Sequence, residues 1–210
     1  MPELPEVETT KRGIEPYISN QSIKKILVRN NKLRIPFNKK LAKEITNIEI
    51  SDIKRRAKYI IVDFANGYSI VIHLGMTGNL RVSKKIKYLK HDHIIFYLSS
   101  GNVLIYNDVR RFGLIQIYRT NESFFLLDNN GPDPFEKEAN ADYLFNKIKK
   151  STASIKSILL NHKVISGIGN IYASEILFAT NISPTRKGKD VSYDECKKIL
   201  QESKKILSKA

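Results

Sequence analysis

The first six residues, MPELPE, place a proline and two glutamates where the start of a chain can do chemistry. Removal of the initiator methionine, which is usual before a residue as small as proline, would leave Pro2 as a free secondary amine. An α-amino group has a pKa of about 8, so a useful fraction is unprotonated near neutral pH. Such an amine can attack an aldehyde-like carbon and form a Schiff base, while Glu3 and Glu6 exchange protons. The plainer interpretation is a capped helix start, because Pro and Glu both suit a first helical turn.

The charge of the whole chain narrows the choice of substrate. Its 210 residues include 36 Lys and Arg against 21 Asp and Glu, a net charge of +15, and nearly half of this excess lies in residues 141–210. Such an excess favours a polyanionic partner, most often nucleic acid, over an acidic membrane surface. An amine nucleophile beside paired carboxylates in a basic protein therefore indicates chemistry on a nucleic-acid sugar.

Composition also excludes several classes of protein. A hydrophobic content of 41% fits a folded globular chain, and no apolar stretch reaches the length needed to cross a bilayer. Cys196 is the only cysteine, which excludes an internal disulfide and a cysteine-based zinc cage. With only four scattered histidines, we expect no metal site, and we interpret His73, His93 and His162 as structural. A reducing, cytoplasmic compartment fits best.

Hydrophobic periodicity divides the chain into a β-rich part and a helical part. A short helix is predicted over residues 4–18, although Gly13 and Pro16 interrupt its end. Strands are predicted over residues 22–30, 44–53 and 113–118, and hairpins over residues 58–74 and 93–107. Helices are predicted over residues 141–150, 154–161 and 169–179, and a last one begins at Ser192 with the capping box Ser192-x-x-Glu195.

A cluster of Pro, Gly and Asn at residues 129–135, NNGPDPF, marks the boundary between the two parts. The expected fold class is α+β: an N-terminal β-sandwich with a leading helix over residues 1–131, followed by an all-α domain over residues 132–210. Six to eight short strands suit a sandwich or a barrel.

Several short motifs, taken together with the N-terminal proline, resemble one enzyme family. PELPEVET is similar to the N-terminal signature of bacterial formamidopyrimidine-DNA glycosylases, which excise oxidised purines and then nick the strand. Further matches follow in the family's order over essentially the whole chain: RRAKYI (55–60), HLGMTG (73–78), KHDH (90–93), DVRRFG (108–113), GPDP (131–134) and SGIGNIYASEILF (166–178). The resemblance implies that the helical part is a helix–two-turn–helix DNA-binding domain.

The resemblance implies a role for each matching residue near the start of the chain. Pro2 matches the nucleophile that attacks C1′ of the damaged nucleotide, Glu3 the acid that helps to open the sugar ring, and Glu6 a second supporting carboxylate. The resulting imine acidifies the C2′ proton, so that the 3′ phosphate leaves by β-elimination and the 5′ phosphate by δ-elimination. Lys58 matches a lysine that contacts the phosphate flanking the lesion, although a solvated basic run is the plainer reading of Arg55-Arg56-Ala57-Lys58.

A second group of matches concerns contacts with DNA. Met76, Arg110 and Phe112 match the side chains that fill the gap left by the everted base, since an inserted apolar or planar group offsets part of the cost of eversion. Simple core packing is the alternative for Met76 and Phe112. The phosphate-contacting positions are His91, Arg111, Gly169 and Asn170. The two glycines before residue 170 predict a tight turn whose exposed N–H groups can hold a phosphate.

The sequence departs from the family at its end. Family members continue into a zinc finger with four cysteines, whereas this chain ends at KKILSKA with Cys196 alone. We therefore expect no zinc and no other cofactor. We also expect weaker DNA binding, because one groove or phosphate contact contributes roughly 1–3 kcal/mol. Abasic-site cleavage should survive this truncation better than lesion excision.

Two alternatives remain open beside a glycosylase and abasic-site lyase for oxidised purines. The sister branch acting on oxidised pyrimidines begins with PEGPE, where this chain has PELPE. A non-catalytic remnant that binds damaged DNA would have kept the basic groove and lost turnover. In each case the expected partner is double-stranded DNA, with no membrane, and the expected form is a monomer in the bacterial cytoplasm, associated with the nucleoid.

Overall fold

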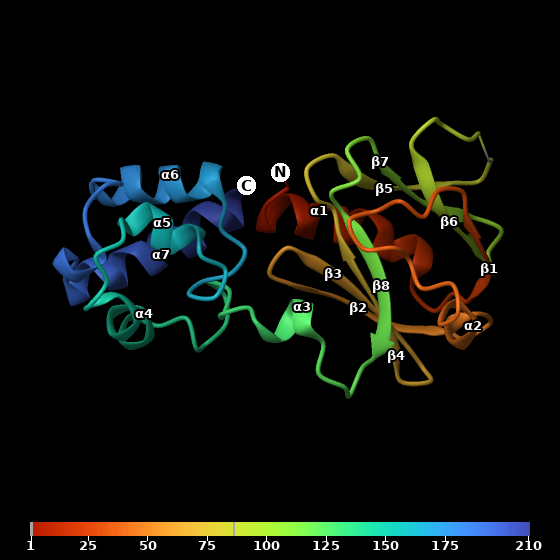
Figure 1. The fold of residues 1–210 in the computed structure, drawn as a ribbon, viewed down its shortest axis with the longest axis horizontal. Helices are drawn as coiled ribbons and strands as arrows, with labels where there is room; N and C mark the ends of the chain where they lie inside the picture. The colour runs from red at the N-terminus through yellow and green to blue at the C-terminus, as the bar shows by residue number, and fades with distance from the viewer. Residues whose placement is uncertain (1, 86) are drawn as a thin grey trace. The chain divides into compact units, whose positions relative to one another are not determined.

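The computed structural model of the chain describes residues 2–85 and 87–210. The backbone divides into two compact units. One, here called the β unit, comprises Pro2 and Glu6–Phe124; the other, the helical unit, comprises Glu3–Pro5 and Phe125–Ala210. Figure 1 shows the strands in the red-to-green part of the chain and the later helices in its green-to-blue part. The chain leaves the β unit a few residues earlier than the expected boundary at residue 131.

The β unit is built from two four-stranded antiparallel sheets. One sheet has the order β1-β6-β7-β5 and the other the order β2-β3-β4-β8. The strands are β1 (Ile23–Val28), β2 (Ile50–Arg56), β3 (Tyr59–Phe64), β4 (Tyr68–His73), β5 (Gly78–Ser83), β6 (Asp92–Leu98), β7 (Val103–Asp108) and β8 (Leu114–Arg119). Together with α1 (Leu4–Ile18) and α2 (Ala42–Ile45), they form the β-sandwich with a leading helix that the sequence predicts.

Alternating side chains of both sheets fill one apolar core. Ile60 and Ile72 of one sheet and Ile94 and Phe96 of the other are buried in the same cluster, as the two-residue period of a strand requires. The apolar side of α1 contributes to this cluster as well, with Ile18 completely buried. The core thus holds the first helix against both sheets.

Two elements differ from the expectation. Residues 44–53 do not form one strand: α2 ends at Ile45, Asn47 adopts a left-handed conformation with φ of 64°, and β2 begins only at Ile50. β5 was not expected at all, because GNLRVS carries one charge and weak alternation; pairing with β7 over six residues forms it.

The helical unit packs short helices around a second apolar cluster. Its elements are α3 (Phe125–Asp128), α4 (Ala141–Ile148), α5 (Ile155–Leu160), α6 (Asn170–Thr180), the 3-10 turn η1 (Gly188–Asp190) and α7 (Tyr193–Lys209). The expected capping box is confirmed: the Ser192 hydroxyl accepts from the Glu195 N–H, and the Glu195 carboxylate accepts from the Ser192 N–H. The fold class, a β-sandwich followed by an all-α domain, is confirmed.

Candidate functional site

The first glutamate of the chain, Glu3, is held by the start of α6. Its side chain is buried, and its two carboxylate oxygens accept hydrogen bonds from the backbone N–H groups of Gly169 (2.7 Å) and Ile171 (3.0 Å). A helix N-terminus carries unpaired N–H groups and a partial positive charge, both of which stabilise an anion. The carboxylate of Glu3, the residue that follows Pro2, is therefore fixed by residues at least 166 positions later in the sequence.

Two glycines make this close approach possible. A Cβ added to Gly169 would collide with the carboxylate of Glu3, and one added to Gly167 would collide with the side chain of Leu4. Gly167 also has φ of 90°, and its carbonyl accepts the N–H of Leu4 at 3.0 Å. The expectation that the Gly169 N–H is open to a phosphate is corrected here, because this N–H points to Glu3 instead.

The other predicted residues at the start of the chain lie around the first turn of α1. Pro2 is half-buried, and Glu6 is exposed in that first turn. Pro2 directly precedes Glu3, so the predicted nucleophile is joined by one peptide bond to a residue whose carboxylate is anchored.

Lys58 lies in the tight turn between β2 and β3. The preceding residue, Ala57, is buried and has φ of 54°, a conformation that a non-glycine residue adopts only when its surroundings hold it there. Arg55 supplies that hold, since its guanidinium donates to the Ala57 carbonyl at 2.9 Å and to the Glu8 carboxylate at 3.1 Å. Arg55 thereby joins the Lys58 turn to α1, a role that the sequence did not reveal.

His73, at the end of β4, is kept neutral. Burial lowers its pKa to about 4, and the nearby positive charges of Arg34 and Lys58 act in the same direction. Its Nδ1 accepts the N–H of Gly75 at 3.0 Å, so the ring proton resides on Nε2. A neutral ring in this position fixes the start of the loop that carries Met76.

The three predicted gap-filling side chains are presented to solvent from two loops of the β unit. Met76 is 42% exposed and Phe112 47% exposed, so neither is a core residue. The guanidinium of Arg110 lies 4.6 Å from the centre of the Phe112 ring, a cation–π contact. The alternative of simple core packing is excluded for both apolar side chains.

The backbones of these two loops touch. A Cβ added to Gly75 would collide with the backbone of Phe112 and Gly113, and Gly75 has φ of 65°. A Cβ added to Gly113 would collide with the Tyr106 hydroxyl and the His73 carbonyl. The glycines of HLGMTG and DVRRFG therefore allow the Met76 loop and the Phe112 loop to meet.

The predicted phosphate-contacting residues of the β unit lie at the ends of β6 and β7. His91 is half-buried just before β6, and Arg111 is exposed with φ of 59°. Asp92 anchors this end of β6: its carboxylate accepts two hydrogen bonds from Arg81 (2.6 and 2.7 Å) and one from Asn107 (2.8 Å). Burial acts to raise the pKa of Asp92, but these bonds outweigh it and lower the pKa to about 2.

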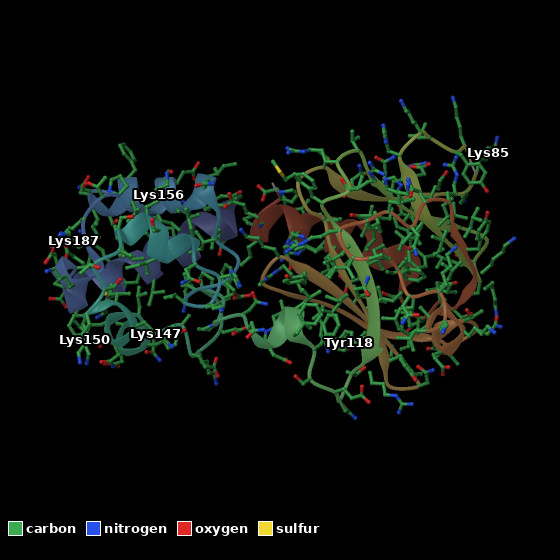
Figure 2. The ribbon with its side chains drawn as sticks, in the orientation of Figure 1. Lys85, Tyr118, Lys147, Lys150, Lys156 and Lys187 are labelled. Atoms are coloured by element: carbon green, nitrogen blue, oxygen red, sulfur yellow. The ribbon has the colours of Figure 1, made fainter. Side chains whose placement is uncertain are left out.

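In the helical unit, Asn170 is exposed at the first position of α6. Figure 2 shows Lys147, Lys150, Lys156 and Lys187 at the surface of this unit, in keeping with its high density of positive charge. α5, a nine-residue connection and α6 form the two helices of the expected helix–two-turn–helix arrangement.

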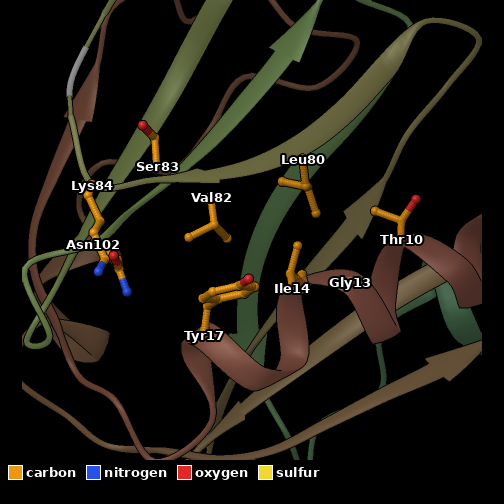
Figure 3. A pocket seen from close by; sticks show the side chains of 9 residues that line it. All are labelled: Thr10, Gly13, Ile14, Tyr17, Leu80, Val82, Ser83, Lys84 and Asn102. Atoms are coloured by element: carbon orange, nitrogen blue, oxygen red, sulfur yellow. The ribbon is translucent and has the colours of Figure 1, made fainter.

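A surface pocket of about 380 Å³ lies apart from all of these residues, between α1 and the edge strand β5. Figure 3 shows Ile14 and Tyr17 of α1 facing Leu80 and Val82 of β5. The remaining lining residues are Thr10, Gly13, Ser83, Lys84 and Asn102. No predicted site residue lines this pocket.

Within residues 2–85 and 87–210, no group of three or more His, Cys, Asp or Glu side chains is arranged to hold a metal ion. None of the helices described there is both long enough and apolar enough to cross a membrane.

Comparison with protein families gives two matches that together span most of the chain. Residues 1–115 match the formamidopyrimidine-DNA glycosylase N-terminal domain. Residues 130–210 match the formamidopyrimidine-DNA glycosylase H2TH domain.

Curated relatives and solved structures agree with these matches. A formamidopyrimidine-DNA glycosylase of Hydrogenovibrio crunogenus is 42% identical over the whole chain and 75% of its own length. One of Klebsiella pneumoniae is 41% identical over 99% of the chain and 77% of its own length. The crystal structure of the Lactococcus lactis enzyme, bound to DNA containing an abasic site, has a TM-score of 0.91 and 32% identity, covering 99% of this chain and 81% of that one.

Proposed function

The chain belongs to the formamidopyrimidine-DNA glycosylase family, and from that premise we propose that it is a DNA glycosylase of base excision repair that also cleaves abasic sites. Its substrates would be oxidised purines in double-stranded DNA. The observation that carries the proposal is the anchored carboxylate of Glu3, the residue that follows Pro2 in the sequence. A merely structural helix start would not require a glutamate buried against the N-terminus of a distant helix.

The chemistry begins with the lone pair of the Pro2 nitrogen. It forms a bond to C1′ of the damaged nucleotide as the bond from C1′ to the base breaks; the Pro2 nitrogen loses its proton, the departing base gains one, and opening of the sugar ring gives the positively charged imine (iminium). The opened ring oxygen needs a proton, and Glu3 is the group placed to exchange it. A carboxylate oxygen can accept more than one hydrogen bond, so the N–H bonds that hold Glu3 leave room for this exchange.

Strand cleavage follows from the same imine. The imine withdraws electrons from C2′, a base removes the C2′ proton, and the 3′ phosphate leaves with the C3′–O electron pair. Repetition of this process at the next carbons releases the 5′ phosphate. Glu6, exposed in the first turn of α1, is the second carboxylate that we assign to proton transfer in these steps.

Binding requires that the damaged base leave the stack and that something replace it. Eversion costs a few kcal/mol, which inserted side chains offset in part. We assign this insertion to Met76, Arg110 and Phe112, which the β unit presents on two touching loops. The inserted side chains would make duplex DNA, rather than single strands, the substrate for base excision.

Phosphate binding falls to four side chains that remain assigned from the sequence. They are Lys58, His91, Arg111 and Asn170. Gly169 is no longer assigned to phosphate binding, because its N–H donates to the Glu3 carboxylate. The net charge of +15 supports attraction to DNA at long range. We assign the chain no membrane partner and a monomeric state.

The chain spans about three quarters of the length of its curated relatives. The cysteine-based zinc site that the family resemblance implies does not fit the residues present, since Cys196 is the only cysteine and is buried. We therefore propose that these 210 residues bind no zinc.

Borohydride trapping on a duplex containing an abasic site tests the proposal. The wild-type chain should give a covalent protein–DNA adduct, and Pro2→Gly should weaken it. Pro36→Gly, an exposed loop proline in the same unit, is the matched control and should trap normally. A gel shift without any adduct from wild-type protein, once its N-terminal methionine is shown to be absent, would mean a non-catalytic DNA-binding protein.

The choice between oxidised purines and oxidised pyrimidines is tested by comparing the excision rates of two lesions. A mutant of the Lactococcus lactis enzyme has been crystallised with DNA containing a formamidopyrimidine, and the wild-type enzyme with DNA containing an oxidised pyrimidine. We expect faster excision of the formamidopyrimidine from otherwise identical duplexes. Preference for the pyrimidine would assign the chain to the sister specificity.

A further inference from the structure

The residue that precedes the Phe112 loop, Asp108, is completely buried at the end of β7. It opens the DVRRFG motif but has no assigned role in the chemistry described above. A buried carboxylate is costly unless hydrogen bonds satisfy it, so its partners show what it is for.

The carboxylate of Asp108 joins the two gap-filling loops. Oδ1 accepts a hydrogen bond from the Thr77 hydroxyl (2.6 Å), which lies next to Met76. Oδ2 accepts from the Gly113 N–H (2.9 Å), which follows Phe112, and from the Tyr106 hydroxyl (3.1 Å). One side chain thus holds both loops at once.

Thr77 extends this hydrogen-bond network from Asp108 to Arg110. Its hydroxyl oxygen, while donating to Asp108, accepts the backbone N–H of Arg110 at 2.9 Å. The backbone of the Arg110 loop is therefore tied to the Met76 loop through a single hydroxyl group. Removing that hydroxyl breaks both bonds and leaves the chain otherwise unchanged.

The backbone of Asp108 is hydrogen-bonded to a third segment assigned to DNA binding, the one that contains His91. Its N–H donates to the carbonyl of His91 at 3.1 Å, and its carbonyl accepts from Nε2 of His93 at 2.6 Å. Met76, Phe112 and His91, which are far apart in the sequence, consequently share one anchor.

The charge on Asp108 also keeps its neighbour in the donating form. Burial raises the pKa of Tyr106, and the adjacent Asp108 charge raises it further. Tyr106 therefore remains a phenol that donates to Oδ2. All three of these donors point to the carboxylate, which an amide could not accept in full.

We propose that Asp108, acting through Thr77, is the positioning residue for insertion: it holds the Met76 and Phe112 loops at the spacing needed to fill the gap left by an everted base. This inference rests on the proposed function. It predicts a defect confined to steps that need a filled gap, because Asp108 touches neither Pro2 nor Glu3 in the described hydrogen-bond network.

The experiment compares two reactions of the same 210-residue chain. Excision of a formamidopyrimidine from a duplex requires gap filling, whereas borohydride trapping on a single-stranded abasic oligonucleotide has no opposite strand and no gap to fill. Thr77→Val keeps the side-chain shape and removes the hydroxyl. Thr46→Val, which removes a hydroxyl bonded to the Ala42 carbonyl in the same unit, is the matched control.

Thr77→Val should slow duplex excision about tenfold, the effect of one to two lost hydrogen bonds, and leave single-strand trapping within about twofold. Thr46→Val should change neither reaction by more than about twofold. Asp108→Asn should also slow duplex excision selectively, and by a larger factor than Thr77→Val. Adding Phe112→Ala to Thr77→Val should cost little more than Phe112→Ala alone, since both act on the same step.

Two results would overturn the inference. One is an equal fall in both reactions for Thr77→Val, which would mean general destabilisation; the other is no fall in either. Failure of Asp108→Asn to fold leaves the Thr77→Val comparison decisive. Absence of single-strand trapping by the wild-type protein would instead refute the proposed Pro2 chemistry, so the two failures are distinguishable.

Discussion

Replacing Gly169 by alanine tests whether the contact between Glu3 and α6 sustains activity. The backbone of Gly169 has φ of −129°, which alanine adopts without strain, so the methyl group itself is the perturbation. That methyl would occupy the space of the Glu3 carboxylate, which must move away. The hydrogen bonds from Gly169 and Ile171, at 2.7 and 3.0 Å, would then be lost.

The size of the effect follows from these two bonds. A hydrogen bond to a charged group contributes about 1.5–3 kcal/mol, so two bonds at the lower end give about 3 kcal/mol. For a chain of this length, that loss lowers the thermal midpoint by about 6–12 °C. Activity should fall further than stability predicts, because the displaced carboxylate of Glu3 is no longer held in position for proton exchange.

Thermal unfolding and borohydride trapping on an abasic duplex, both measured for Gly169→Ala, check these numbers. Gly13→Ala is the control: Gly13 lies inside α1 with open space around it, so alanine should stabilise the helix by about 0.5–1 kcal/mol. If Gly169→Ala traps as efficiently as wild type and unfolds at the same temperature, the carboxylate of Glu3 has no essential anchor at α6, and the reasoning is refuted.

Three further predictions concern single residues. Asp92→Asn should lose about 2 kcal/mol at neutral pH in urea unfolding, because the lowered pKa of about 2 stabilises the fold fully above the ordinary value of 3.8 and progressively less as pH falls toward 2; an unchanged acid-unfolding curve would contradict this. Gly75→Ala should destabilise by at least about 2 kcal/mol more than Gly101→Ala, which shares the positive φ but has open space, since only the former meets the backbone of the Phe112 loop; equal losses would mean that the loops do not touch. Cys196 should react with a thiol reagent only after denaturation, because burial and the Glu195 charge raise its pKa to about 11; rapid labelling of folded protein would show that α7 opens.

The elements most visible in the sequence were those with strong local signals. The leading helix over residues 4–18 and the capping box at Ser192 match the structure because turn chemistry and apolar periodicity determine them locally. The hairpin of β3 and β4 was visible because Asn66 and Gly67 separate two β-branched runs. β5 was missed, because an edge strand with intermediate burial has little alternation to display.

The site was predicted as a set of residues but not as an arrangement. Pro2, Met76 and Phe112 were recognised from motifs, whereas the anchors that hold them depend on contacts across long stretches of sequence. The bond from Gly169 to Glu3 joins positions 166 residues apart, and the bond from Thr77 to Asp108 joins positions 31 apart. The glycine pattern correctly predicts a tight turn, but its prediction that the Gly169 N–H binds a phosphate is wrong, since the pattern does not say which group approaches that N–H.

The distribution of acidic groups connects the fold with the proposed function. Among the residues that the structure describes, the buried charged side chains are all carboxylates: Glu3, Asp63, Asp92, Asp108 and Asp133. Glu3 and Asp108 accept hydrogen bonds from backbone N–H groups, and Asp92 holds Arg81 at the start of β6. Burying acidic side chains favours binding to a polyanion such as DNA. The buried carboxylates hold the backbone by hydrogen bonds, and the basic groups that remain exposed dominate the surface potential. Substituting such an acid therefore affects the position of DNA-facing loops, and substituting a surface lysine affects the salt dependence of binding.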